Sequence, residues 1–138
     1  MCVEAIYTLE GGSPPTIKVN NTGIYGPGTG KEGQVSSAIG KAKQVEGGKL
    51  KVSFFANIYG PYWVTQLYGD AAEGYSVAVI WSCEDFGPFS FGNDLWILSR
   101  TRQLPPGITL DSIYAVAEAD GIDVKSLAME NTVQTNCA

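Results

Sequence analysis

The chemistry open to this chain is limited first by a residue type that it lacks, because none of its 138 residues is histidine. Histidine is the general base of serine and cysteine triads and a common zinc ligand, so histidine-dependent sites of both kinds are excluded. The three cysteines, Cys2, Cys83 and Cys137, match no zinc-binding spacing. Glu84 and Asp85 form an acidic pair without further metal-ligand partners, and we expect them in a solvated loop. The sequence therefore predicts no catalytic residue, no metal site and no cofactor.

Two further motifs have weak support. Gly26, Gly28 and Gly30 resemble a phosphate-binding loop, but they do not stand between a strand and a helix, so this interpretation fails its context test. Asn20 begins an Asn-Asn-Thr triplet, which is an acceptor for N-glycosylation in a secreted protein. Such triplets also arise by chance.

Composition places the chain among folded proteins and excludes several partners. A length of 138 residues with 44% hydrophobic and 17% charged residues predicts one globular domain over residues 1–138. The formal net charge is −5, and the nine basic residues are spread thinly along the sequence, which argues against a nucleic-acid partner. No apolar run approaches the 18 residues of a membrane span, and no signal-peptide pattern is recognised.

The elements that would carry any site are short strands, because 17 glycines and 7 prolines interrupt the chain. The clearest alternation is KLKVSFF, in which Leu50, Val52 and Phe54 share one face and two lysines lie on the other. The pattern predicts seven strands, over residues 2–9, 16–24, 34–45, 49–55, 62–68, 75–82 and 94–100. Their spacing predicts an up-and-down antiparallel order that closes into a barrel or stacks as a sandwich.

The last third of the chain changes character after a Phe/Gly loop expected over residues 86–92. A break at residues 104–107 precedes a helix that Thr109 caps and Gly121 ends. One stripe of this helix is apolar and consists of Leu110, Ile113, Tyr114 and Ala117. A last short strand is predicted over residues 123–129, followed by a polar tail.

Several stretches together resemble the lipocalin family and, within it, the apolipoprotein D-like group. They are KLKVSFF (49–55), PYWV (61–64), YSVAVIWSC (75–83), DLWILSR (94–100), LPP (104–106) and GIDVKSLAM (121–129). The resemblance implies a secreted, all-β, eight-stranded antiparallel barrel with one C-terminal helix packed outside and a cavity for one small apolar molecule. It also implies a Cys2–Cys137 disulfide.

The sequence departs from the family pattern at its start. No first strand with a Gly-x-Trp motif precedes Cys2, and Gln66-Leu67-Tyr68 stands where the family has Thr-Asp-Tyr. Arg100 matches the arginine of the third motif, whose tryptophan partner is absent. We therefore expect a fragment, an N-terminally truncated chain, or a chain in which something else fills the gap, with exposed strand edges through which it could oligomerise. The family partner of Cys83 would lie upstream.

Alternation together with the resemblance predicts which side chains contact a ligand. The expected inward set is Tyr7, Asn21, Leu50, Val52, Phe54, Tyr62, Val64, Ile80, Trp96 and Leu98. Ala78 follows the same parity, and Tyr7, Asn21 and Tyr62 are the candidate hydrogen-bonding groups. Without the resemblance, the aliphatic members would be interpreted as plain core. Trp63 and Trp81 have the outward parity and are expected to pack beneath the helix.

The predicted function is the binding and transport of a small hydrophobic molecule, such as a lipid, sterol, retinoid, fatty acid, bilin or carotenoid, without enzymatic activity. Two alternatives remain. One is a protein-interaction β-domain with a filled core. The other is an isomerase that uses a cavity thiol, although Cys83 is expected at a strand end and not inside the barrel.

Overall fold

The computed structural model describes the backbone of residues 1–86 and 89–137, and the side chains of residues 1–83 and 93–137. The chain divides into two compact units. The first contains Met1–Tyr59 together with Glu130–Ala138, and the second contains Gly60–Met129. The single domain expected over residues 1–138 stays a prediction.

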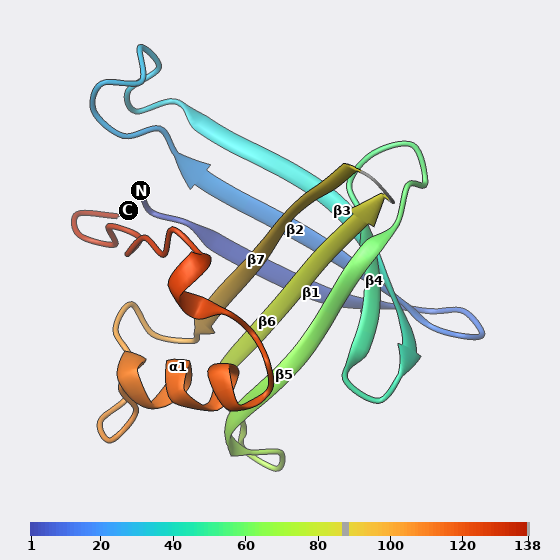
Figure 1. The fold of residues 1–138 in the computed structure, drawn as a ribbon. Helices are drawn as coiled ribbons and strands as arrows, with labels where there is room; N and C mark the ends of the chain where they lie inside the picture. The colour runs from blue at the N-terminus through green and yellow to red at the C-terminus, as the bar shows by residue number, and fades with distance from the viewer. Residues whose placement is uncertain (87–88, 138) are drawn as a thin grey trace. The chain divides into compact units, whose positions relative to one another are not determined.

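The first unit is a sheet of four strands, each antiparallel to the next along the chain (Figure 1). They are β1 (Glu4–Glu10), β2 (Thr16–Ile24), β3 (Val35–Glu46) and β4 (Lys49–Ser53). Gly47 lies in the tight turn between β3 and β4, where its φ of 51° is one that glycine adopts without steric cost. The alternating sequence of this region thus forms the hairpins that were predicted.

The register of these strands separates two kinds of side chain. Val19 on β2 is directly opposite Tyr7 on β1 and Gly40 on β3, so the three residues share one face. Val19 is only 1% exposed, as is Ala42 on the same face. Lysines occupy the opposite face. The apolar face therefore carries the buried part of this unit.

The second unit combines three antiparallel strands with a helix (Figure 1). The strands are β5 (Gly60–Asp70), β6 (Gly74–Phe86) and β7 (Phe89–Ser99). The α-helix α1 (Leu110–Ala119) follows, and then the 3₁₀ helix η1 (Val124–Ser126). The expected all-β fold with seven antiparallel strands and one C-terminal α-helix is confirmed. None of the helices in the described part of the chain is long and apolar enough to span a membrane.

Helix α1 begins and ends as the sequence predicts. The Ser112 N–H donates to Thr109 Oγ1 at 3.1 Å, and the Thr109 N–H donates to Ser112 Oγ at 3.3 Å, which is a reciprocal capping box. Gly121 follows the last turn with a φ of 90°. The helix packs on the sheet through a cluster of buried residues, namely Val77, Val79, Leu95, Ile113, Ala117, Ile122 and Val124.

Several local predictions are wrong. Glu84 and Asp85 were expected in a loop, but their backbone belongs to strand β6. Residues 123–129 form no strand, because Val124 turns its side chain into the buried cluster and its carbonyl accepts locally from the Leu127 N–H at 3.1 Å. The Phe/Gly-rich residues 86–92 are not a loop throughout. Strand β6 continues to Phe86 and β7 begins at Phe89, and the two residues pair, which agrees with the β propensity of aromatic residues. Residues 87–88 lie outside the described part.

The disulfide expected from the resemblance is present between Cys2 and Cys137. Hydrogen bonds hold the tail beside the start of β1, since the Cys2 N–H donates to the Val133 carbonyl at 2.8 Å and Gln134 Nε2 donates to the Val3 carbonyl at 2.7 Å. Cys83 is a free thiol. Both chain ends of the first unit are thus fixed at one point.

The disulfide gives a prediction about stability. Its cysteines are 135 residues apart, so it should raise the free energy of unfolding by about 5 kcal/mol through the entropy of the unfolded chain. The Cys2→Ser/Cys137→Ser variant should show this loss in urea unfolding, with Cys83→Ser as the control variant. In the oxidised, denatured protein, iodoacetamide should label one thiol. Three labelled thiols would contradict the pairing.

Candidate functional site

The sheet of the second unit presents two apolar faces, and α1 covers only one of them. Val77, Val79 and Leu95 pack against the helix in the buried cluster. The alternate residues point the other way, where Ile80 is directly opposite Trp96 and Ala78 opposite Leu98. Val64 on β5 pairs with Ile80, so it joins this face. We call this surface of β5, β6 and β7 the open face.

An aromatic pair dominates the open face. The rings of Tyr62 and Trp96 are stacked, with centroids 6.1 Å apart and planes inclined by 24°. Trp96 remains 41% exposed although it lies on a central part of its strand. Together with Ile80 and Leu98, this pair presents a broad apolar surface with one phenolic hydroxyl, which suits a ligand that is mostly hydrocarbon.

A β-bulge at Thr65 changes the parity of β5. Val64 pairs with Ile80 but Gln66 pairs with Val79, so Thr65 is an extra residue on β5. Its hydroxyl donates to the Val79 carbonyl at 3.3 Å. Beyond the bulge, Leu67 faces Ala78 and joins the open face, 47% exposed. Leu67 was missed by sequence reasoning, because unbroken alternation would place it on the helix side.

The bulge also brings a polar group to the helix. Gln66 Nε2 donates to the backbone carbonyl of Ile113 at 3.1 Å, and the Tyr68 hydroxyl donates to Gln66 Oε1 at 2.5 Å. Gln66 is buried, so these bonds compensate its desolvation. The Gln66-Leu67-Tyr68 segment therefore divides its side chains between the helix and the open face.

The apolar face of the first unit carries the other expected residues. Tyr7 is on it, and Asn21 has the same parity as Val19. Val52 is directly opposite Ala42, and Leu50 shares its parity on β4. Sequence reasoning did not include Val19 and Ala42 in the inward set, although the alternation of β2 and β3 could have placed them there. The structure thus places these expected contacts on a face without lysines.

Phe54 packs against Gly40, whose lack of a side chain leaves room for the aromatic ring. A Cβ atom on Gly40 would lie 2.7 Å from Cδ1 of the Phe54 ring and 2.7 Å from the Ser53 carbonyl oxygen. Only glycine leaves room for this close approach. Phe54 itself is 43% exposed. Gly40 therefore determines where the ring of Phe54 lies.

Comparison with known proteins decides the family of the chain. A family described as the lipocalin-like domain matches residues 1–132. The chain belongs to this lipocalin family. It is 32% identical over 141 residues to apolipoprotein D of Rattus norvegicus and 31% identical over 138 residues to that of Oryctolagus cuniculus, matches that cover 99% of the chain. It spans 66% of the length of these two proteins.

A bacterial member of the family is also similar. The outer membrane lipoprotein Blc of Vibrio cholerae is 38% identical over 100 residues, which is 70% of this chain and 52% of that protein. The resemblance to lipocalins and to the apolipoprotein D-like group, read from the strand sequences, is thereby confirmed.

The free cysteine of this lipocalin lies away from the open face. Cys83 lies inside β6 and not at a strand end as expected, because β6 extends to Phe86. It follows the parity of Val79 and Trp81, which is the helix-covered one, and is opposite Asn93. Trp81 packs against the buried cluster as predicted, and its ring meets that of Trp63 edge-on at 5.5 Å.

The backbone N–H groups of the glycine-rich loop bind the carboxylate of Glu32, which belongs to the same loop. The N–H groups of Gly28 and Gly30 donate to Glu32 Oε1 at 2.8 and 3.1 Å. Hydrogen bonds from the backbone N–H groups of Glu32 itself and then of Gly30 lower the pKa of the Glu32 carboxyl. These donors are therefore occupied, which agrees with the rejection of a phosphate loop. No group of three metal-ligating side chains gathers among residues 1–83 and 93–137.

The packing of Phe54 on Gly40 gives a second prediction. Gly40→Ala should lower the free energy of unfolding by about 1–3 kcal/mol, because the new methyl group meets a backbone oxygen that cannot rotate away. Gly11→Ala is the matched control, since no atom lies within 4 Å of its added Cβ, and it should change stability by less than about 0.5 kcal/mol. Urea unfolding measures both. Equal stabilities would contradict the close contact.

Proposed function

We propose that this lipocalin binds and carries a small hydrophobic molecule and catalyses no reaction. The observation that supports the proposal most directly is the open face, which keeps Trp96 and Leu67 41% and 47% exposed in a unit that covers its other face with a helix. Apolar side chains gathered on one surface mark a binding site. Membership of the lipocalin family supports the same function.

The energetics of the open face favour an apolar ligand. Burial of apolar surface contributes about 25 cal/mol per Å², and a flat molecule that covered the exposed part of Trp96 would gain this contribution. The Tyr62 hydroxyl supplies a polar group that could orient the ligand. Lipids, sterols, retinoids, fatty acids, bilins and carotenoids are the ligand classes of this kind.

The residues expected to contact the ligand keep that role in the proposal. They are Tyr7, Asn21, Leu50, Val52 and Phe54 on the first unit and Tyr62, Val64, Ile80, Trp96 and Leu98 on the second, to which we add Leu67. The Cys2–Cys137 disulfide supports an oxidising, extracellular location. Oligomerisation through strand edges stays a prediction.

The parity of Cys83 counts against the cavity-thiol enzyme. A thiol that acted on a ligand at the open face would need the parity of Ile80, whereas Cys83 has that of Val79. The binding proposal requires no bond to be made or broken, so it needs no nucleophile on this face.

Trp96 gives the test of the proposed function. Trp96→Leu should weaken retinol binding about tenfold, because the stacked aromatic surface is lost. Trp63→Leu is the matched control, since Trp63 lies on the other side of β5 and pairs with Trp81, and it should leave the affinity within about twofold. The fluorescence of retinol reports binding independently of the tryptophans, with oleate, progesterone and biliverdin as competitors. No saturable binding of any of the four, or equal weakening in both variants, would overturn the proposal.

A further inference from the structure

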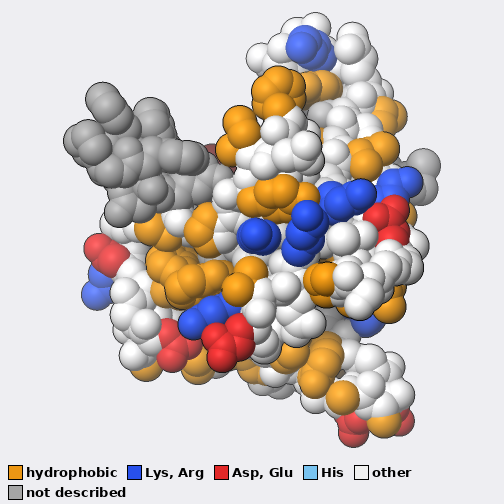
Figure 2. Space-filling model, turned by 90° about the vertical axis from the view of Figure 1, so that its right-hand side faces the viewer, with side chains coloured by type: hydrophobic (Ala, Val, Ile, Leu, Met, Phe, Trp, Pro, Cys, Tyr) orange, Lys and Arg blue, Asp and Glu red, His pale blue; other side chains and the backbone are white. Residues whose placement is uncertain are grey.

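Four of the seven lysines lie together on the face of the first unit's sheet that is opposite Val19. Strand register places Lys18 on β2 directly opposite Lys41 on β3, and Lys43 on β3 directly opposite Lys51 on β4. The sequence separates these residues, but the sheet gathers them. Figure 2 shows lysine or arginine side chains in a row across one face, with apolar side chains beside them. We call this set the lysine face.

The lysine face is incompletely neutralised. Like charges placed directly opposite one another destabilise a sheet. Lys41 Nζ lies 4.0 Å from Glu10 Oε2, whereas no described carboxylate lies within ion-pair distance of the other three lysines. Lys43 and Lys51 instead lie over the ring of Tyr59, at 4.9 and 5.4 Å from its centroid. The ring holds two cations close together.

This concentration is unusual for the charge of the chain. The formal net charge is −5, and the second unit has nine carboxylates against three basic side chains. The first unit has six lysines and five glutamates. Positive charge is thus gathered on one face at a cost in repulsion, and an anion bound there would offset that cost.

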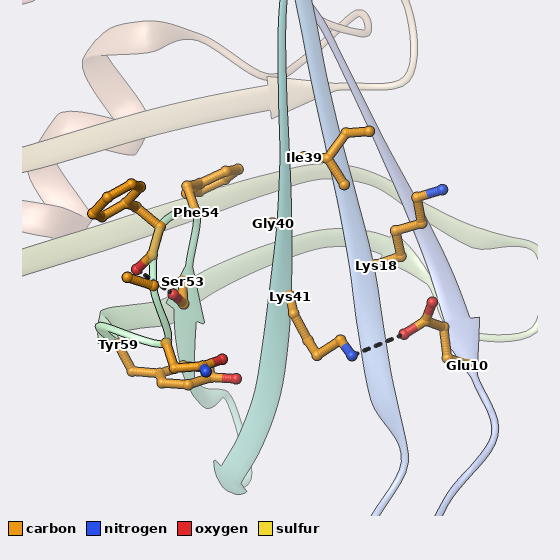
Figure 3. A pocket seen from close by; sticks show the side chains of 11 residues that line it. Glu10, Lys18, Ile39, Gly40, Lys41, Ser53, Phe54 and Tyr59 are labelled. Carbon is orange, nitrogen blue, oxygen red and sulfur yellow. Dashed lines mark hydrogen bonds and ion pairs between the residues drawn. The ribbon is translucent and has the colours of Figure 1, made fainter.

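A hollow lies within the lysine face (Figure 3). Its volume is about 370 Å³, and its walls are β1 to β4 together with the segment 54–59. Lys18 and Lys41 line it together with Asn57 and Tyr59, which add amide and hydroxyl groups, and with Ile39, Phe54 and Phe55, which add apolar surface. This volume is large enough for a phosphate group and part of the molecule that carries it.

We propose that this hollow binds the phosphate group of a phosphorylated small molecule or lipid headgroup. Lys18 and Lys41 would hold the anion, and Lys43 and Lys51 would add to the positive potential beside it. Lysine ammonium groups bind phosphate as point charges, without the fixed geometry of arginine. Glu10 at the rim competes for Lys41. The lysines of the site lie on the face opposite Tyr7, Asn21, Leu50 and Val52, and Phe54 alone of the proposed hydrophobic contacts also lines the hollow. The site is therefore a second binding function.

The first probe is pyrophosphate in low-salt buffer. Its binding to the whole chain is measured by chemical-shift changes in two-dimensional NMR spectra. Lys18→Gln/Lys41→Gln should weaken binding by about tenfold. The control Lys31→Gln/Lys125→Gln makes the same change in net charge away from the lysine face and should stay within about twofold. Glu10→Gln should strengthen binding. Equal weakening in both double variants, or no binding by the unmodified chain, would overturn the proposal.

Two further measurements separate the alternatives. Cosedimentation with phosphatidylcholine vesicles that contain phosphatidic acid, but not with pure phosphatidylcholine vesicles, would assign the phosphate to a lipid headgroup. Pyrophosphate binding without cosedimentation would assign it to a soluble molecule. The Lys18→Gln substitution should leave the protein equally or more resistant to urea, because it removes a like-charge pair. Reduced resistance would contradict the stated cost of the lysine face. The Lys18→Gln/Lys41→Gln variant should bind retinol as the unmodified chain does, which distinguishes this site from the open face.

Discussion

The pleat of the β-strand is the constraint on which both units depend. Successive side chains must point to opposite faces, so a strand that is apolar at nearly every position, such as YSVAVIWS in β6, produces two apolar faces and needs two partners. Helix α1 covers only the face of Val77 and Val79. The face of Ile80 and Trp96 receives no such cover from the elements of its own unit. The open face is therefore a direct consequence of an apolar strand with a helix on one side.

The bulge at Thr65 shows how this constraint is adjusted locally. Without the extra residue, Gln66 would point to the open face and leave a polar amide among apolar groups. The shift in register turns Gln66 toward α1, where its amide binds the carbonyl of Ile113, and brings Leu67 to the open face instead. One inserted residue thus removes a polar group from the proposed site and adds a hydrogen bond at the helix.

Most of the architecture could be predicted from sequence because alternation is a local property. The two faces of Lys49–Phe55 follow from lysines at every second position, and the helix follows from Thr109, Gly121 and an apolar stripe. Local sequence patterns do not determine the register between neighbouring strands. The bulge at Thr65 and the gathering of Lys18 beside Lys41 depend on which residues stand opposite one another. The strand predicted over residues 123–129 was wrong for a related reason, since Val124 can be buried without a strand partner.

The segment from Phe54 to Tyr59 links the two faces of the first unit. Phe54 occupies the space above Gly40 on the side shared with Val19, whereas Tyr59 lies beneath Lys43 and Lys51 on the other. Ala56 and Asn57 between them have φ of 49° and 59°, a backbone conformation that non-glycine residues adopt only when their surroundings hold them. Contacts at both ends supply that restraint. Phe54 therefore belongs both to the expected hydrophobic contacts and to the lining of the lysine hollow, and the turn that follows it brings Tyr59 to the lysines.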